Sequence, residues 1–177
     1  MSSAGNITLT GIFGSAPTIL NINGNVINNI SGSGTGSPVA NGINTTSGPT
    51  INIFNNKIYN ISETGVISTI QGAVNGILLS NGTNVTVYNN FVSDLKAPAA
   101  SLTDAIRGIS VVSGTASSNY NLYYNSVYVN ASSTGGTFGT SGIYHTTNAT
   151  ATTAALSMID NIIVNTSTAS GTGVTAA

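Results

Sequence analysis

Four of the seven charged side chains fall within one stretch, 93-SDLKAPAASLTDAIRG-108, which holds Asp94, Lys96, Asp104 and Arg107. Two carboxylates beside two bases are residue types that general acid–base cleavage of sugars uses. A surface loop with local ion pairs, each contributing little to stability, explains the same residues. We favour the loop, because the neighbouring repeats offer no carboxylate at a matching position.

Other catalytic residue types are scarce. The chain has one histidine, His145, and no cysteine, so it lacks the partners that a His/Cys metal site or a thiol nucleophile needs. Neither a G-x-S-x-G nucleophile elbow nor a P-loop is present. We therefore expect a protein that is not an enzyme and that has no catalytic residue, metal or cofactor.

The charge and hydropathy pattern excludes two classes of partner. Charged residues make up 4% of the chain, the net charge is −1, and no basic patch occurs, so we expect no nucleic-acid binding. No run of about 18 apolar residues predicts a membrane span. The opening MSSAGNITLT is not a signal peptide. The chain either stays inside the cell or is a piece of a longer secreted chain, and we favour the second, which predicts an extracellular or cell-surface location.

One phrase recurs five times with a period near 33 residues, as in 50-TINIFNNKIYNIS-62, and such a period predicts a solenoid. Its second asparagine recurs at spacings of 31, 34, 35 and 36 residues. The copies are Asn25, Asn56, Asn90, Asn125 and Asn161.

Apolar residues recur at fixed distances from this asparagine and define four predicted core columns. None of these positions carries a charged or small polar side chain. The column after the small G-I motif is Ile12, Ile43, Ile77, Ile109, Ile143 and Val174. The other three columns are Leu20, Ile51, Val85, Tyr120 and Leu156; Ile22, Ile53, Val87, Leu122 and Met158; and Ile27, Ile58, Val92, Val127 and Ile163.

Alternation with period 2 and a preference for Ile and Val predict strands, with little or no helix. If each repeat forms one coil, parallel strands stack about 4.8 Å apart and the columns line the interior. The recurrent asparagine then lies at a corner, where the left-handed backbone that asparagine tolerates is useful. We predict that its side-chain amides form a ladder of hydrogen bonds from coil to coil; a simple turn residue is the alternative.

The G-I motif and the later β-x-β-x-N-N-x-β phrase resemble the right-handed, single-stranded parallel β-helix of pectate-lyase-like proteins. The resemblance implies an all-β solenoid of about five coils, longer than usual at 31–36 residues because of long loops. It implies a single domain over 1–177, with repeats at 11–41, 42–75, 76–107, 108–141 and 142–177. The Asn, Thr, Ser and Gly-rich composition also resembles repeat regions of large secreted bacterial surface proteins.

Function is less constrained, because this fold serves enzymes, adhesins and structural proteins alike. We favour a structural module: a rigid spacer, adhesin stalk or filament subunit that associates head to tail through open ends. Phe54, Tyr88 and Tyr123 share one outward column and form a candidate glycan stripe, so a carbohydrate-binding module is the alternative; loops covering the stripe would remove it. A polysaccharide lyase or hydrolase fragment using residues 94–107 is the third hypothesis.

Overall fold

The computed structural model describes residues 6–147, 151 and 153–177. These residues form strands and no helix, so none of them belongs to a helix able to cross a membrane. The strands are β1 (Thr8–Ser15), β2 (Ile19–Asn23), β3 (Val26–Gly32), β4 (Val39–Ser47), β5 (Thr50–Phe54), β6 (Lys57–Glu63), β7 (Val74–Leu79), β8 (Asn84–Tyr88), β9 (Phe91–Val92), β10 (Leu95–Lys96), β11 (Leu102–Val111), β12 (Asn119–Tyr123), β13 (Ser126–Val129), β14 (Phe138–His145), β15 (Ala155–Ile159), β16 (Ile162–Asn165) and β17 (Thr175–Ala176).

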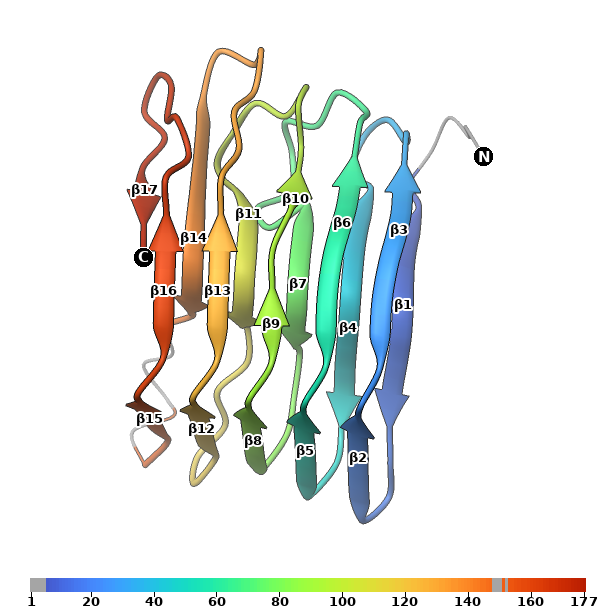
Figure 1. Cartoon of the computed structure of the whole chain (residues 1–177), viewed down its shortest axis with the longest axis vertical. Coiled ribbons are helices and arrows are strands. Elements are labelled where there is room, and N and C mark those ends of the chain that lie inside the picture. Colours follow the sequence, from blue (N-terminus) through green and yellow to red (C-terminus); the bar gives the residue numbers. More distant parts are fainter. Residues whose placement is uncertain (1–5, 148–150, 152) are drawn as a thin grey trace.

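The strands form three parallel sheets that stack as a β-solenoid of about five turns, which confirms the predicted fold class (Figure 1). The first sheet has the order β1-β4-β7-β11-β14-β17, and the second has the order β2-β5-β8-β12-β15. The third sheet contains β3, β6, β9, β10, β13 and β16. Each turn therefore crosses the three sheets in the same order, and β17 starts one further layer on the first sheet alone.

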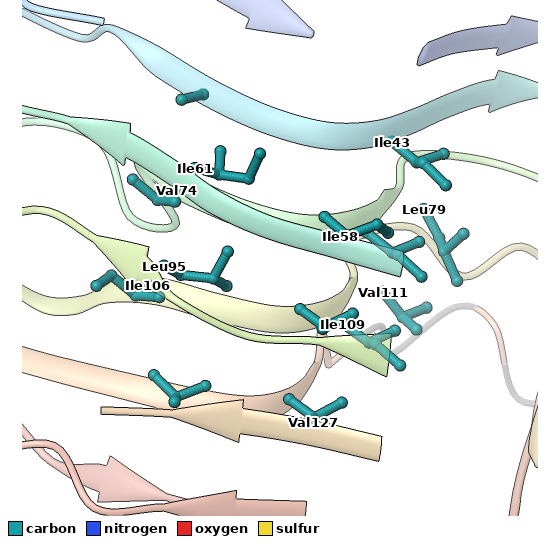
Figure 2. Close-up of a cluster of buried hydrophobic side chains, with 14 of the residues drawn as sticks. Ile43, Ile58, Ile61, Val74, Leu79, Leu95, Ile106, Ile109, Val111 and Val127 are labelled. Atoms are coloured by element: carbon teal, nitrogen blue, oxygen red, sulfur yellow. The ribbon is translucent and has the colours of Figure 1, made fainter. Parts of the chain in front are cut away.

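The registers match the columns expected from the repeats. Ile12, Ile43, Ile77, Ile109 and Ile143 are paired in succession along the first sheet. The equivalent pairings join the Ile22 and Leu20 columns in the second sheet. The core-column residues of the three middle coils are fully or almost fully buried, and Figure 2 shows part of this interior, including Ile43, Ile58 and Ile109.

A further core column in the third sheet escaped the sequence analysis. Ile61, Leu95 and Val129 are fully buried, and the partly buried Ile30 pairs with Ile61. In the first three coils a residue in the left-handed conformation precedes this column and interrupts the alternation. These residues are Asn29, Asn60 and Asp94, with φ of 58°, 54° and 52°. Because the extra residue shifts the period by one, alternation alone does not find the column.

Two predicted core residues are wrong. Met158 has the expected register with Leu122, but it is 48% exposed because it lies in the last full coil, where no strand covers it. Val174 is 66% exposed and lies outside its predicted column. Thr175 pairs with Thr140, which places Val174 level with Gly139 rather than with Ile143. The G-I signal at 173–174 therefore does not continue the series.

The glycine of the G-I motif is required by close packing. Gly11, Gly42, Gly76, Gly108 and Gly142 occupy the same position in successive coils. A Cβ at Gly76 would lie 2.3 Å from Cγ1 of Val92 and 2.6 Å from the carbonyl oxygen of Gly108. Real Cβ atoms do not approach other atoms so closely, so the first and third sheets meet here only without a side chain.

The recurrent asparagine lies at the corner between the second and third sheets, as predicted. The left-handed residue is nevertheless the one before it. Those residues are Gly24, Asn55, Asn89, Tyr124 and Asp160, with φ between 51° and 68°. The ladder asparagine therefore supplies the amide, and the residue before it makes the turn. At Tyr124 the left-handed conformation is sterically unfavourable, because the residue is not Gly, Asn or Asp.

Candidate functional site

The most extended polar feature of the molecule is a ladder of asparagine side chains. Asn56 is 2% exposed, and its Nδ2 donates to Oδ1 of Asn90 at 2.9 Å. The same Nδ2 donates to the carbonyl of Ile22 in the preceding coil at 2.9 Å, and the backbone N–H of Asn56 donates to Oδ1 of Asn90 at 3.1 Å. The Asn56 amide thus joins three coils.

The ladder is continuous from the first coil to the fifth. Asn25 donates to Asn56, Asn90 to Asn125, and Asn125 to Asn161, through both the backbone N–H and Nδ2 at 2.9–3.1 Å. The hydrogen bonds always run from one coil to the Oδ1 of the next, so the ladder has a direction. The predicted asparagine ladder is confirmed, and its buried amides are fully used in holding coils together.

A second polar row lies on the first sheet, immediately before each glycine of the G-I motif. Nδ2 of Asn75 donates to Oδ1 of Asn41 at 3.0 Å, and Asn41 in turn donates to Thr10 at 3.3 Å. Arg107 follows Asn75 in this row. The recurring polar residue before G-I is a signal in the sequence that we did not use.

The 93–108 stretch does not form one site. Lys96 Nζ lies 2.7 Å from Asp94 Oδ1 at the third sheet, and both side chains are about half exposed. Arg107 Nε lies 2.7 Å from Asp104 Oδ2 on the first sheet, with side-chain exposures of 8% and 19%. Each carboxylate is paired with its own base and the pairs belong to different sheets, so the four residues are not brought together.

The Arg107–Asp104 pair makes more contacts with neighbouring residues than an ordinary surface ion pair does. The guanidinium Cζ lies 3.4 Å from the ring centroid of Tyr144, a cation–π contact. Oδ1 of Asp104 accepts from Ser141 Oγ at 2.9 Å, and the Asp104 backbone N–H donates to Gln71 Oε1 at 2.8 Å. Beside the pair lies a hollow of about 210 Å³, lined by Val39, Ile70, Gln71, Gly72, Asn75, Leu78, Arg107 and Val112.

Glu63 is a buried carboxylate that the sequence did not mark. Its Oε1 accepts from the backbone N–H of Gly34 at 3.0 Å and of Gly65 at 2.9 Å. Its Oε2 is buried without a hydrogen-bond partner among the described residues, facing the Cα of Gly32. Because it binds backbone groups on two successive coils, Glu63 connects the loops that follow β3 and β6.

The outward column of Phe54, Tyr88 and Tyr123 has the expected register. The rings of Phe54 and Tyr88 are stacked, with centroids 4.8 Å apart and planes inclined by 6°. This distance equals the spacing of the strands, so each ring covers a face of the other. Sugars stack on ring faces, and the stacking of Phe54 on Tyr88 removes one face of each ring from that use. The Tyr123 hydroxyl donates to Asn121 Oδ1 at 2.8 Å.

The remaining titratable groups do not form a candidate catalytic or metal site among the described residues. His145 is exposed at the end of β14, and no group of three or more His, Cys, Asp or Glu residues able to hold a metal occurs among the described residues. Burial raises the pKa of Tyr120, whose ring is 1% exposed and whose hydroxyl lies 3.4 Å from the carbonyl of Gly82. Asp160 lies at the exposed corner of the last full coil.

Comparison with protein-family models, with curated proteins and with solved structures finds no match for this chain.

Proposed function

We propose that the chain is a non-enzymatic structural module of a secreted or cell-surface protein, acting as a rigid spacer, an adhesin stalk or a filament subunit. The observation that supports this function most directly is the unbroken ladder from Asn25 to Asn161. The amides of the ladder connect each coil to the next one along the whole solenoid, as a rigid spacer or filament requires.

The direction of the ladder makes its two ends complementary. Among the described residues, Oδ1 of Asn25 accepts no hydrogen bond, and the backbone N–H of Asn161 has no acceptor. A further coil stacked on the last one would let Asn161 donate to an asparagine Oδ1, as Asn125 does to Asn161. At the last full coil the core-column residue Met158 is 48% exposed, because no strand covers it. Open strand edges and apolar ends favour stacking on another coil.

The strand β17 constrains such stacking. It pairs with β14 through Thr175 and Ala176, in the layer that β1 of a second copy would occupy in a gapless junction. The two-residue strand therefore has to move aside before a second copy can continue all three sheets. The eight-residue β1 of a second copy would then pair with β14 over a longer stretch than the two-residue β17 does.

The experiment is light scattering on the purified chain over a dilution series, with negative-stain images of the same samples. Stacked copies are expected to form fibres with a repeat of about 24 Å, from five coils at about 4.8 Å each. Met158→Lys places a charge on the last full coil and should abolish fibres, whereas Ser132→Lys on an exposed loop should not. A monomer at every concentration would contradict the filament role and leave the spacer role.

Carbohydrate binding through Phe54, Tyr88 and Tyr123 is the second proposal. A glycan screen comparing the protein with Tyr88→Ala and Tyr123→Ala tests it. Loss of binding in both variants would favour this function over the structural one. The non-enzymatic assignment fails if the chain turns over a polysaccharide and Asp94→Asn or Asp104→Asn abolishes that turnover.

A further inference from the structure

Arg107 is the buried member of a small set of cations. The chain has three Lys and Arg residues, and Lys57 and Lys96 are exposed while Arg107 is 6% exposed. Burying a guanidinium is costly unless its donors are used. Its position on the outer face of the first sheet, outside the hydrophobic interior, means that the fold does not require a charge there.

Three contacts hold the guanidinium, and Arg107 lines the hollow. Tyr144 covers one face of its plane, and the Cα of Gly72 lies against it, since a Cβ there would be 3.1 Å from Nη1. Nε is occupied by Asp104. Among the described residues, no protein acceptor bonds to Nη1 or Nη2. The two terminal amino groups thus form a fixed pair of donors without a protein partner.

The hollow beside Arg107 has mainly apolar walls, in contrast to the charged guanidinium. Val39, Ile70, Leu78 and Val112 line it with aliphatic groups. Its polar lining includes Asn75, which is 2% exposed and whose Oδ1 is buried without a hydrogen-bond partner among the described residues. An amide oxygen only accepts hydrogen bonds, so the groups of Arg107, and not Asn75 Oδ1, could donate to an acceptor in the hollow.

We propose that this hollow, the Arg107 pocket, binds a small monocarboxylate with a short aliphatic body. The two Nη groups match the two oxygens of a carboxylate in a planar, bidentate arrangement. The aliphatic walls match a branched chain of a few carbons, and a volume of about 210 Å³ suits a ligand smaller than a typical drug molecule. Asp104 orients the guanidinium through Nε, so the two Nη groups are fixed in place before a ligand arrives.

The observations favour this class over a sugar or a phosphate. A sugar ring needs hydrogen-bond partners around its edge, and four of the lining residues are aliphatic. A phosphate dianion would bring two negative charges beside Asp104, whereas a monocarboxylate brings one. The function of the pocket is independent of whether the chain forms a spacer or a filament.

The test is titration of the folded chain with 3-methylbutanoate, followed by calorimetry and by methyl NMR of Ile70, Leu78 and Val112. We expect saturation with a Kd of about 1 mM or tighter, with shifts confined to these methyl groups. The neutral amide of the same shape is expected to bind at least about tenfold more weakly, because it offers one acceptor oxygen instead of two. Acetate, which lacks the aliphatic body, should also bind more weakly.

Two variants locate the site. Arg107→Lys keeps the charge and loses the planar pair of donors, and should weaken binding about tenfold or more. Leu78→Trp fills the hollow, leaves both residues of the ion pair in place, and should abolish binding. This variant still tests the proposal if Arg107→Lys does not fold. Lys96→Gln, at the exposed ion pair, is the control and should bind as the parent does. Equal binding of acid and amide, unchanged binding in Leu78→Trp, or no saturation by about 20 mM overturns the proposal.

Discussion

Nδ2 of Asn56 donates to Oδ1 of Asn90 at 2.9 Å, although the two residues are 34 positions apart in the sequence. Both side chains are 2% exposed, and the backbone N–H of Asn56 also donates to the same oxygen. One acceptor atom therefore satisfies two buried donors of the preceding coil. If that oxygen is removed, its two donors lose their acceptor in a place that water does not reach. A substitution in the buried middle of the ladder should therefore cost more stability than one at its exposed ends.

The first prediction concerns this inequality. Asn90→Ala leaves the backbone N–H of Asn56 and one of the two N–H groups on its Nδ2 without an acceptor, and we expect the free energy of unfolding to fall by about 3 kcal/mol. Asn25→Ala, in the first coil, removes donors only and should cost less than about 1 kcal/mol. Urea unfolding monitored by circular dichroism measures both. Equal losses in the two variants would show that the ladder adds nothing beyond each local turn.

The second prediction concerns the glycine of the G-I motif. Gly76→Ala forces a Cβ to within 2.3 Å of Val92 and 2.6 Å of a backbone oxygen, so we expect a loss of at least about 3 kcal/mol or failure to fold. Gly136→Ala is the control, because a Cβ there meets nothing within 4 Å, and its effect should stay within about 0.5 kcal/mol. Thermal unfolding of both variants is the measurement. A well-folded Gly76→Ala would mean that the first and third sheets are free to separate.

The third prediction separates the two ion pairs of the 93–108 stretch. Asp104→Asn leaves the buried guanidinium of Arg107 without its counter-charge and should cost about 3 kcal/mol. Asp94→Asn, in the exposed pair with Lys96, should cost less than about 1 kcal/mol, and added salt should remove even that difference. Denaturant unfolding at low and high salt distinguishes the pairs. Similar costs for both substitutions would contradict the burial of the Arg107 pair.

The fourth prediction concerns alkaline pH. Burial raises the pKa of Tyr120 above the value that it has in the unfolded chain, about 10. The unfolded chain therefore loses this proton first, and the free energy of unfolding should decrease as the pH rises past about 10, until the pH exceeds the raised pKa. Below pH 10 the residue contributes no pH dependence.

Tyr120→Phe tests this assignment, since it keeps the buried ring and removes the ionisable hydroxyl. The alkaline loss of stability should become shallower in this variant, as followed by unfolding at pH 8 to about 11.5. Tyr124→Phe, at a ring that is 57% exposed, is the matched control and should retain the parent profile. An unchanged slope in Tyr120→Phe would assign the alkaline transition to another group.

The sequence by itself determined the period, the all-β class, most of the interior columns and the asparagine ladder. Each of these depends on one residue type recurring at one place in the coil, as with Ile43, Ile77 and Ile109. In a solenoid, equivalent places in successive repeats become neighbours in space, so a pattern along the chain translates directly into contacts. That is why the pairing of Asn56 with Asn90 was predictable across 34 residues.

The tertiary structure alone decided the features that do not recur. Glu63 and Arg107 look like surface charges in the sequence, yet both are buried, because loops and neighbouring strands that occur once in the chain cover them. The extra left-handed residue at Asn60 moves Ile61 inward against the local alternation, and loop length shifts Val174 out of its column. Burial of such residues is set by contacts with distant segments, which local spacing does not encode.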